Sequence, residues 1–435
     1  MAANLSWSTF GKATELRQRI LFTIGLLIIY RLGTYIPVPG IDGGALREFM
    51  EQAAAGLGGV VNLFTGGAIG RMGVFALGIM PYISASIIVQ LMTAMVPALE
   101  QLKKEGEQGR KKINQYTRYG TVFLATFQAY GLAVSLEAGN LVTDPGWFFR
   151  VACVVTLVGG TMFLMWLGEQ ITARGVGNGI SLIIFAGIVA ALPTALASTL
   201  ELGRTGALSA LFIIGFLIFA IAVITFIVFV ERAQRRIIVQ YPKRQVGNRM
   251  FGGESSHIPL KLNTSGVIPI IFATSILLTP VSIAGFSGGG GGGILNTITA
   301  VLGRGQPLFF LLFAVLIIFF AFFYTAIVFN PEETADNLKK NGGFVPGIRP
   351  GKNTAEFFDY VLTRLTVVGA AYLTLVALLP EILISRFSVP FFFGGTSLLI
   401  VVVVSLDTVA QIQSHLLAHQ YEGLIRKAKL KGRRG

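Results

Sequence analysis

Long runs of apolar residues recur ten times along the chain and are separated by polar stretches. Each run is long enough to cross the hydrocarbon core of a bilayer, which is about 30 Å thick. Because an isolated segment in lipid has to satisfy its own backbone hydrogen bonds, each run is predicted to be a helix. The predicted spans are Ile20–Ile36, Gly78–Leu99, Tyr119–Leu136, Trp147–Leu167, Ile180–Leu196, Ala207–Val230, Gly266–Phe286, Leu308–Phe329, Leu365–Ile384 and Phe391–Leu406.

The composition and the charges fit a protein that spans a membrane. The chain has 435 residues, 53% of them hydrophobic and 13% charged, and its mean hydropathy is +0.70. If the N-terminus is cytoplasmic, 28 of the 35 Lys and Arg residues fall in segments on the cytoplasmic side. Because cytoplasmic loops carry an excess of Lys and Arg, both termini are predicted to be cytoplasmic. No small-residue cleavage site follows the first span, so this span is expected to be retained.

Ten spans divide into two sets of five. A set with an odd number of spans reverses its orientation, so any structural repeat between the halves is predicted to be inverted. The expected fold is an all-α integral membrane protein with two pseudo-symmetric, five-helix halves. The predicted parts are an N-terminal half over 1–197, an external hinge loop over 198–206, a C-terminal half over 207–410 and a basic cytoplasmic tail over 411–435.

Two cytoplasmic loops, 231–265 and 330–364, are long and carry seven and five Lys and Arg residues. The first alternates apolar with basic residues, which predicts a hairpin of strands. The second is rich in turn residues. Both are expected to stand out from the membrane as a docking surface for a large acidic partner.

One apolar stretch, NLFTGGAIGRMGVFALGIM (Asn62 to Met80), is a poor candidate for a span. Five of its 19 residues are glycine, and each lowers helix stability by roughly 1 kcal/mol. Arg71 lies in its middle, and a charge at the bilayer centre costs about 3 kcal/mol or more. The stretch is too weak to cross a membrane alone and too apolar to be an ordinary loop.

The sequence carries no recognisable catalytic motif. Its three histidines form no H-E-x-x-H metal site, there is no G-x-S-x-G, and the glycine run lacks the G-K-[ST] ending of a phosphate loop. An enzyme is therefore disfavoured, no cofactor or metal is expected, and any energy source has to be a partner. No ionisable residue lies near the middle of a span, which counts against an ion-coupled carrier. The residues alone still give a channel and a small-molecule transporter similar weight.

Small polar residues and prolines mark the second and seventh predicted spans, GIMPYISASIIVQ and SGVIPIIFATS. Hydrogen bonds between helices are one interpretation of these polar residues, and ordinary packing of small residues is the other. Charges near the spans are few. Glu169 and Glu231 lie at cytoplasmic ends, where interfacial anchoring or a local ion pair is expected.

Seven motifs, spread over nearly the whole chain, closely resemble the SecY family of bacterial protein-conducting channel subunits. They are FALGIMPYISASII, KKEGEQGRKKINQYTRYGT, GTMFLMWLGEQIT, RGVGNGIS, VFNPEETADNLKK, FVPGIRPG and PFFFGGTSLLIVVVV. The resemblance implies two five-helix halves around a central pore in the bacterial inner membrane. It also implies that unfolded preproteins cross through the pore, whereas signal sequences and membrane segments leave sideways between the second and seventh helices.

The resemblance also assigns roles to individual residues. The implied pore ring is Ile79, Ile83, Ile184, Ile271 and Ile400. The implied plug is a short, movable helix from Asn62 to about Phe75 that includes Phe64, Gly67 and Arg71. The implied lateral gate contains Ser84, Ser86, Gln90, Thr274 and Ser275. The implied docking residues are Arg244, Arg249 and Arg349, with Asn248 standing where relatives carry a second arginine beside Arg249.

The partners that the resemblance implies are numerous. They are the small membrane proteins SecE and SecG, the ATPase SecA, a translating ribosome, signal sequences, nascent chains, SecDF, YidC and membrane lipids. SecA, the ribosome or the proton-motive force would supply the energy, which agrees with the missing nucleotide motif.

Overall fold

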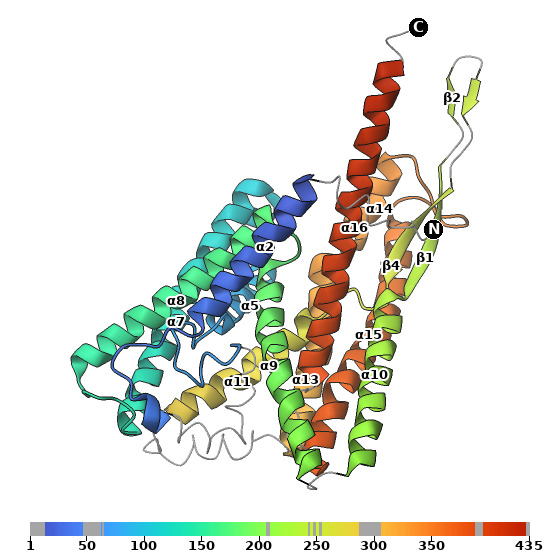
Figure 1. Ribbon diagram of the computed structural model, residues 1–435. Helices are drawn as coiled ribbons and strands as arrows, with labels where there is room; N and C mark the ends of the chain where they lie inside the picture. Colours follow the sequence, from blue (N-terminus) through green and yellow to red (C-terminus); the bar gives the residue numbers. More distant parts are fainter. Residues whose placement is uncertain are drawn as a thin grey trace. The chain divides into compact units, whose positions relative to one another are not determined.

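The computed structural model shows a mostly helical chain (Figure 1). The residues that the structure describes are 14–46, 62, 65–205, 209–241, 244–246, 249–251, 255–286, 306–387 and 395–431. The chain divides into two compact units. Unit 1 comprises Met1–Arg204, Leu278–Arg304 and Ile400–Gly435, and unit 2 comprises Thr205–Leu277 and Gly305–Leu399.

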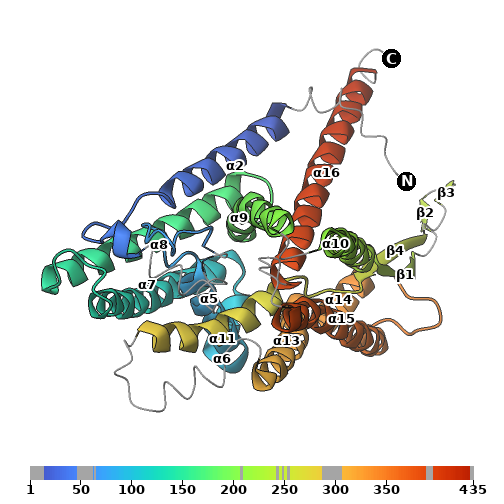
Figure 2. The ribbon, with the colours of Figure 1, turned by 60° about the horizontal axis from the view of Figure 1, so that its bottom comes forward.

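Unit 1 holds the helices of the N-terminal part of the chain. They are α2 (Thr14–Gly33), α5 (Met80–Met95), α6 (Pro97–Lys104), α7 (Glu107–Ala138), α8 (Trp147–Arg174) and α9 (Gly179–Arg204). The C-terminal helix α16 (Gly395–Lys431) belongs to this unit from Ile400 onward. Helices α7 and α8 lie side by side, with α5 against α7 and α2 against α8 (Figures 1 and 2).

Unit 2 combines helices with two short antiparallel strand pairs. Its helices are α10 (Ala210–Arg232), α11 (Ile268–Phe286), α13 (Pro307–Val328), α14 (Pro331–Lys340) and α15 (Lys352–Phe387). Helix α11 belongs to this unit only as far as Leu277. Its strands are β1 (Gln234–Gln240), β2 (Arg244–Val246), β3 (Arg249–Phe251) and β4 (Ser255–Lys261). Strand β1 pairs with β4 and β2 pairs with β3, so the hairpin predicted in the first cytoplasmic loop is confirmed.

Each predicted span overlaps one of these helices, but not every helix is long enough to span by itself. Within the described residues, six helical segments are long and apolar enough to cross a membrane. They are Glu107–Ala138, Trp147–Arg174, Ile213–Arg232, Pro307–Lys340, Lys352–Pro380 and Thr396–Ala418. The bent pair α5 and α6 would make a seventh. A helical protein with several spans is thus confirmed, and the number of ten stays a prediction.

The second predicted span, Gly78–Leu99, is not one straight helix. Helix α5 ends at Met95, and α6 starts at Pro97 with its axis turned by 98°. Val96 between them has an extended backbone, with φ −103° and ψ 114°. Because proline has no N–H and disfavours a helical conformation in the residue before it, the break falls at this point.

The stretch predicted as the hinge loop, 198–206, also differs. Helix α9 continues through Arg204, so most of that stretch is helical. Glu201 and Arg204 form an exposed ion pair at 3.7 Å, three residues apart on the helix. Ion pairs of this spacing stabilise a helix even where the sequence is no longer strongly apolar. Hydropathy alone therefore does not predict that the helix continues here.

The turn between α8 and α9 is held by side chains from both ends of the chain. The N–H of Val176 donates to Oγ1 of Thr23 on α2 at 3.0 Å, and the N–H of Gly177 donates to Oε1 of Gln411 on α16 at 2.8 Å. A Cβ on Gly179 would lie 2.0 Å from the carbonyl oxygen of Gly168, so only glycine permits this close approach. The turn thus fixes four helices of unit 1 relative to one another.

Residues 72–79, called the anchored part, are tied to the chain that follows α2. The N–H of Val38 donates to the carbonyl of Met72 at 2.9 Å, and the N–H of Val74 donates to that of Ile36 at 2.9 Å. These two bonds form an antiparallel bridge around Gly73. Backbone N–H and C=O groups of this non-helical segment therefore find hydrogen-bond partners in another segment of the protein, as an apolar environment requires.

The anchored part also packs against α8. The ring of Phe75 lies between those of Tyr30 and Phe163, with ring centroids 6.2 and 6.0 Å away, and its side chain is buried. A Cβ on Gly160 would lie 2.1 Å from the carbonyl oxygen of Val74. The absence of a side chain at Gly160 is therefore what lets this backbone lie on the helix.

In unit 2, the two long loops 231–265 and 330–364 contact each other. Gln240 at the end of β1 exchanges two backbone hydrogen bonds with Phe344, at 2.9 and 3.0 Å. Buried apolar side chains from β1, β4, α14 and the start of α15 form one core beneath them, with Phe358 fully buried. The sequence predicted two protruding loops, and the structure joins them into one packed platform.

The tie between α2 and the α8–α9 turn makes a first prediction. Thr23→Val keeps the side-chain shape but leaves the buried N–H of Val176 without its acceptor, which should cost about 1–3 kcal/mol. The thermal midpoint of the purified protein in detergent should fall. Thr126→Val is the control, because its hydroxyl bonds only to its own helix and is exposed. Equal midpoints for the two variants would contradict the role of Thr23.

Adjacent glycines on α8 give a second prediction. Gly160→Ala should displace the backbone of Val74 and lower the thermal midpoint, whereas Gly159→Ala should not, because a Cβ there meets nothing within 4 Å. On an exposed helix either change would stabilise by roughly 0.5–1 kcal/mol. Thermal unfolding of both variants in detergent measures the difference. A Gly160→Ala protein as stable as the Gly159→Ala protein would show that the close approach is not needed.

Candidate functional site

The segment expected to be a short plug helix begins at Asn62, which is helical, but residues 65–79, called the turn segment, form a succession of turns. Asn62 organises its start, because its carbonyl accepts from the N–H of Gly67 and its Oδ1 accepts from the N–H of Gly70, each at 2.8 Å. Gly66 and Gly67 have φ values of +66° and +84°. Side chains rarely tolerate this left-handed region, so the glycines allow reversals of the chain that end any helix.

Two arginines meet near the end of α2. Arg71 is exposed, and its guanidinium carbon lies 4.0 Å from the centroid of the Tyr35 ring. Arg31 donates from Nη1 to the carbonyl of Gly66 at 2.5 Å. The sequence pointed to Arg71 but gave no partner for it. Phe64, which was also assigned to the plug, lies outside the described residues.

The expectation of a weakly held plug does not fit the whole turn segment. In the anchored part, the side chains of Met72, Phe75 and Ala76 are buried. They join a core formed with the chain after α2 and with α7 and α8. Only the first part of the turn segment, residues 65–71, is free of the bridge to the chain after α2.

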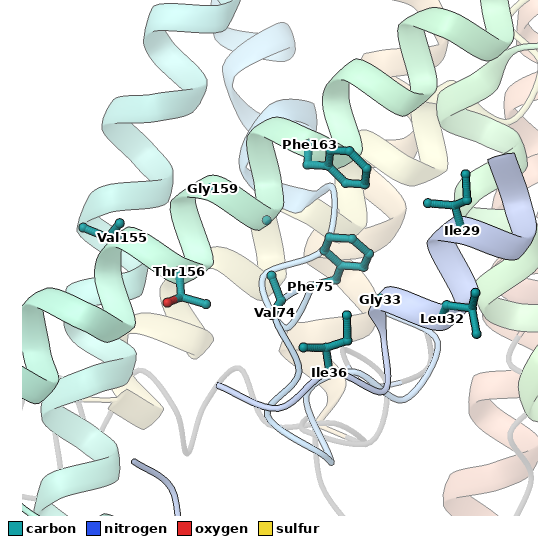
Figure 3. Close-up of a pocket in the computed structure, with 11 residues that line it drawn as sticks. Ile29, Leu32, Gly33, Ile36, Val74, Phe75, Val155, Thr156, Gly159 and Phe163 are labelled. Atoms are coloured by element: carbon teal, nitrogen blue, oxygen red, sulfur yellow. The ribbon is translucent and has the colours of Figure 1, made fainter. Parts of the chain in front are cut away.

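An apolar recess of 490 Å³ opens between α2 and α8, and the anchored part contributes to its lining (Figure 3). Its lining residues are Ile29, Leu32, Gly33, Ile36, Val74, Phe75, Val155, Thr156, Gly159, Gly160 and Phe163. Thr156 is the one polar side chain among them, and its hydroxyl bonds to its own helix at 2.7 Å. A site for a polar small molecule needs several convergent polar groups, which this lining does not offer.

The five isoleucines expected in the pore ring are distributed over both units. Ile79, Ile83, Ile184 and Ile400 belong to unit 1, and Ile271 belongs to unit 2. All five side chains are buried, with exposed fractions from 0% for Ile400 to 7% for Ile271. Their type and burial suit an apolar lining, and the ring itself stays a prediction.

The polar residues expected at the lateral gate lie on α5 and α11. Gln90 donates from Nε2 to Oγ of Ser86 at 3.1 Å, within α5, and Ser84 is half-buried there. Thr274 and Ser275 are buried, and each hydroxyl donates to the carbonyl four residues earlier in α11. These donors are thus used inside their own helices, and hydrogen bonds between the helices stay a prediction.

The expected docking residues belong to the platform of unit 2. Arg349 is exposed, and its carbonyl accepts from Oγ1 of the buried Thr354 at 2.9 Å. The backbone of this loop tip is therefore fixed while the guanidinium projects. Arg244 and Arg249 lie on the paired strands β2 and β3, and Asn248 lies outside the described residues.

Ion pairs link α7 to α8 in unit 1. Arg118 contacts Glu169 at 2.6 Å, and Arg150 contacts Glu137 at 2.6 Å. The local ion pair expected for Glu169 is confirmed, and Glu231 accepts from an asparagine amide in the loop before α11 at 2.7 Å. Within the described ranges, no group of three His, Cys, Asp or Glu residues could hold a metal ion.

Comparison with known sequences gives full-length matches. The model of the SecY family matches residues 73–409. The Protein translocase subunit SecY of Escherichia coli strain K12 is 56% identical over 430 residues, which cover 98% of this chain and 97% of that protein. Its counterpart in Rickettsia typhi is 56% identical over 424 residues, which cover 96% of this chain and 98% of that protein.

Solved structures share the fold at lower identity. A SecY protein, whose plug domain is described as stabilising the closed state of the translocation channel, superposes with a TM-score of 0.65. Sec61 of the canine ribosome-channel complex superposes with a TM-score of 0.64. Each of the two structures is 18% identical in sequence to this chain, and each match covers 92% of both chains. The likeness to these structures concerns the fold alone. With the family match and the 56% identity over nearly its whole length, the chain belongs to the SecY family.

Proposed function

We propose that this chain is the central subunit of a protein-conducting channel, which moves unfolded preproteins across the membrane and passes membrane segments into it. The observation that carries the proposal is the 56% identity, over 98% of the chain, to a protein translocase subunit. The chain is then a channel subunit and not an enzyme, and SecA, a ribosome or the proton-motive force supplies the energy. A small-molecule transporter is not retained, because neither the relatives compared above nor any feature of the described residues supports it.

The proposed architecture has ten spans in two inverted, five-helix halves around a central pore. The overlap of every predicted span with a helix supports it. The proposed place is the bacterial inner membrane, with both termini cytoplasmic. The 28 of 35 basic residues that fall on one side support this orientation.

Two elements seal the proposed pore. The proposed ring consists of Ile79, Ile83, Ile184, Ile271 and Ile400. Branched aliphatic side chains would fit closely around an extended polypeptide, and they offer it no fixed hydrogen bond. An apolar constriction also sheds water when it is empty. The plug, proposed for residues 62–75, closes the external side. The plug domain described for a SecY protein of the same fold supports this assignment.

A lateral gate is proposed between α5 and α11. Ser84, Ser86, Gln90, Thr274 and Ser275 lie on these two helices. Hydrogen bonds between helices in membranes average only about 0.6 kcal/mol, so a polar seam can close and still reopen. Signal sequences and membrane segments would leave through this seam.

The platform of unit 2 is proposed as the docking surface for SecA or the ribosome. Arg349 supplies a cation on a fixed backbone, and Arg244 and Arg249 lie on the hairpin. Sec61 in a ribosome-channel complex has the same fold, which supports a ribosome as partner. The further proposed partners are SecE and SecG as small subunits, SecDF, YidC and membrane lipids.

Preprotein export tests both the function and the docking residue. Membrane vesicles that contain SecE and SecG, with this chain as their only central channel subunit, should bring a preprotein into a protease-protected space when SecA and ATP are added. Arg349→Glu should abolish this export at normal abundance, because repulsion replaces attraction at the contact. Arg349→Lys, which keeps the charge, should export. No export by the unaltered chain would contradict the function, and normal export by Arg349→Glu would contradict the docking role.

Ion conductance without substrate tests the seal. Ile184→Asn places a hydrogen-bonding amide where an apolar lining is proposed, so water should be stabilised and the resting conductance should rise several-fold. Ile184→Leu keeps the lining apolar and should conduct as little as the unaltered protein. Both should still export preprotein, because the ring does not push the substrate. Equal conductance of the two variants would remove Ile184 from the seal.

A further inference from the structure

The end of α2 makes two separate contacts with the first part of the turn segment, residues 65–71. Arg31 donates from Nη1 to the carbonyl of Gly66 at 2.5 Å. The Tyr35 ring, one turn further along, lies under the guanidinium of Arg71 at 4.0 Å. Arg31 also donates from Nη2 to Oη of Tyr35 at 3.1 Å, so one arginine fixes the ring on which the other stacks.

Gly66 lies in a close-fitting cradle within unit 1. A Cβ built on it would lie 3.0 Å from Oη of Tyr30, 3.1 Å from Cα of Gly187 on α9 and 3.2 Å from Nη1 of Arg31. Its φ of +66° also requires glycine. The carbonyl of Gly66 is therefore presented to the guanidinium in one defined position. Hydrogen bonds from a charged donor are shorter and stronger than neutral ones, so this bond adds a strong hold on residues 65–71 to the two bonds that Asn62 accepts from Gly67 and Gly70.

Repulsion between Arg31 and Arg71 opposes these contacts. The guanidinium groups of Arg31 and Arg71 lie 5.1 and 4.0 Å from the centroid of the same Tyr35 ring, and their like charges repel each other. Tyr35 is also more than half exposed, and a cation over an exposed ring is bound weakly. The contacts of Arg31 and Tyr35 can therefore define a resting position for residues 65–71 and still be weak enough to break.

The two parts of the turn segment meet at an unusual residue. Met72 has a φ of +44°, in the left-handed region that residues other than glycine seldom adopt. The bridge of the anchored part to the chain after α2 begins with the carbonyl of Met72. Strained backbone of this kind concentrates in switch regions. Met72 therefore lies between residues 65–71, which bond to Arg31 and Asn62, and the anchored part, which the backbone bridge to the chain after α2 holds.

We propose that Arg31 and Tyr35 form a latch that positions the plug, and that the moving part of the plug ends at Arg71. This inference rests on the proposed function, since it names the residues that set the closed position of the seal. When a polypeptide enters, the bond to Gly66 and the stacking of Arg71 break, the carbonyl of Ala68 releases the N–H of Gly73, and residues 65–71 swing about Met72. The anchored part stays in place and keeps the start of α5 fixed.

Two fully buried alanines lie on either side of the proposed hinge and report its motion. Ala68 in the moving part and Ala76 in the anchored part are both 0% exposed. Each is replaced by Cys in a Cys153→Ala background, and its labelling by a membrane-impermeant thiol reagent is timed in reconstituted protein. Arg31→Ala should speed labelling at position 68 by about tenfold or more, given the net worth of a charge-assisted hydrogen bond. Labelling at position 76 should not change.

Variants of the tyrosine separate the two contacts of the latch. Tyr35→Ala should also speed labelling at position 68, and Tyr35→Phe should do so less, because the ring that carries Arg71 remains. Tyr119→Ala is the control, since this tyrosine is exposed on α7. If labelling at position 68 is unchanged in Arg31→Ala and Tyr35→Ala, the latch is wrong. If labelling at position 76 rises equally, the anchored part moves too and the hinge at Met72 is wrong.

A reversible lock tests whether release is needed for transport. Tyr35→Cys and Arg71→Cys, joined by a short cleavable thiol crosslinker, should stop preprotein export, and cleavage of the linker should restore it. Export at the unaltered rate by the crosslinked protein would overturn the latch. Failure of the uncrosslinked, unaltered channel to export any preprotein would instead contradict the proposed function. The labelling rates at positions 68 and 76 do not depend on export, so they judge the latch in either case.

Discussion

Backbone that lies among membrane helices without being helical has to find its hydrogen-bond partners within the protein, and much of unit 1 follows from this constraint. The turn segment, residues 65–79, is satisfied from three sources. Arg31 and Asn62 bond to its first part, and the chain after α2 bonds to the anchored part. Glycines on the facing helices, such as Gly160, remove the side chains that would keep these backbones apart.

The hydrogen bonds from these three sources differ in how easily they break. This difference distinguishes residues 65–71 from the anchored part. Backbone bridging and buried packing hold the anchored part, and exchanging them would expose polar groups to an apolar environment. Side chains of Arg31, Tyr35 and Asn62 contact residues 65–71, and side-chain contacts are exchanged at lower cost than a backbone bridge. In unit 2 the same contrast is seen, because Arg349 projects from a loop whose backbone Thr354 and the Gln240–Phe344 bridge hold in place.

Hydropathy and charge in the sequence determined the class of the protein, because the bilayer imposes one strong rule on every spanning segment. The helices, the hairpin in the first cytoplasmic loop and the ion pair of Glu169 were all predictable on that basis. The local chemistry of Pro97 also carries the signal for the bend after α5, although a hydropathy run passes over it. The glycines between Asn62 and Met80 indicated a special segment, again from local properties alone.

Only the tertiary structure decided which conformation that special segment adopts. The family resemblance implied a short helix, whereas residues 65–79 form turns, because the stability of these turns comes from partners that are far away in the chain. Gly66 bonds to a residue 35 positions earlier, and the carbonyl of Val74 lies on Gly160. Arg31 was visible in the sequence as a charge in an apolar span, but its partner was not. Residue type and local spacing set which conformations are allowed, whereas contacts between distant segments select among them, and those contacts exist only once the helices have packed.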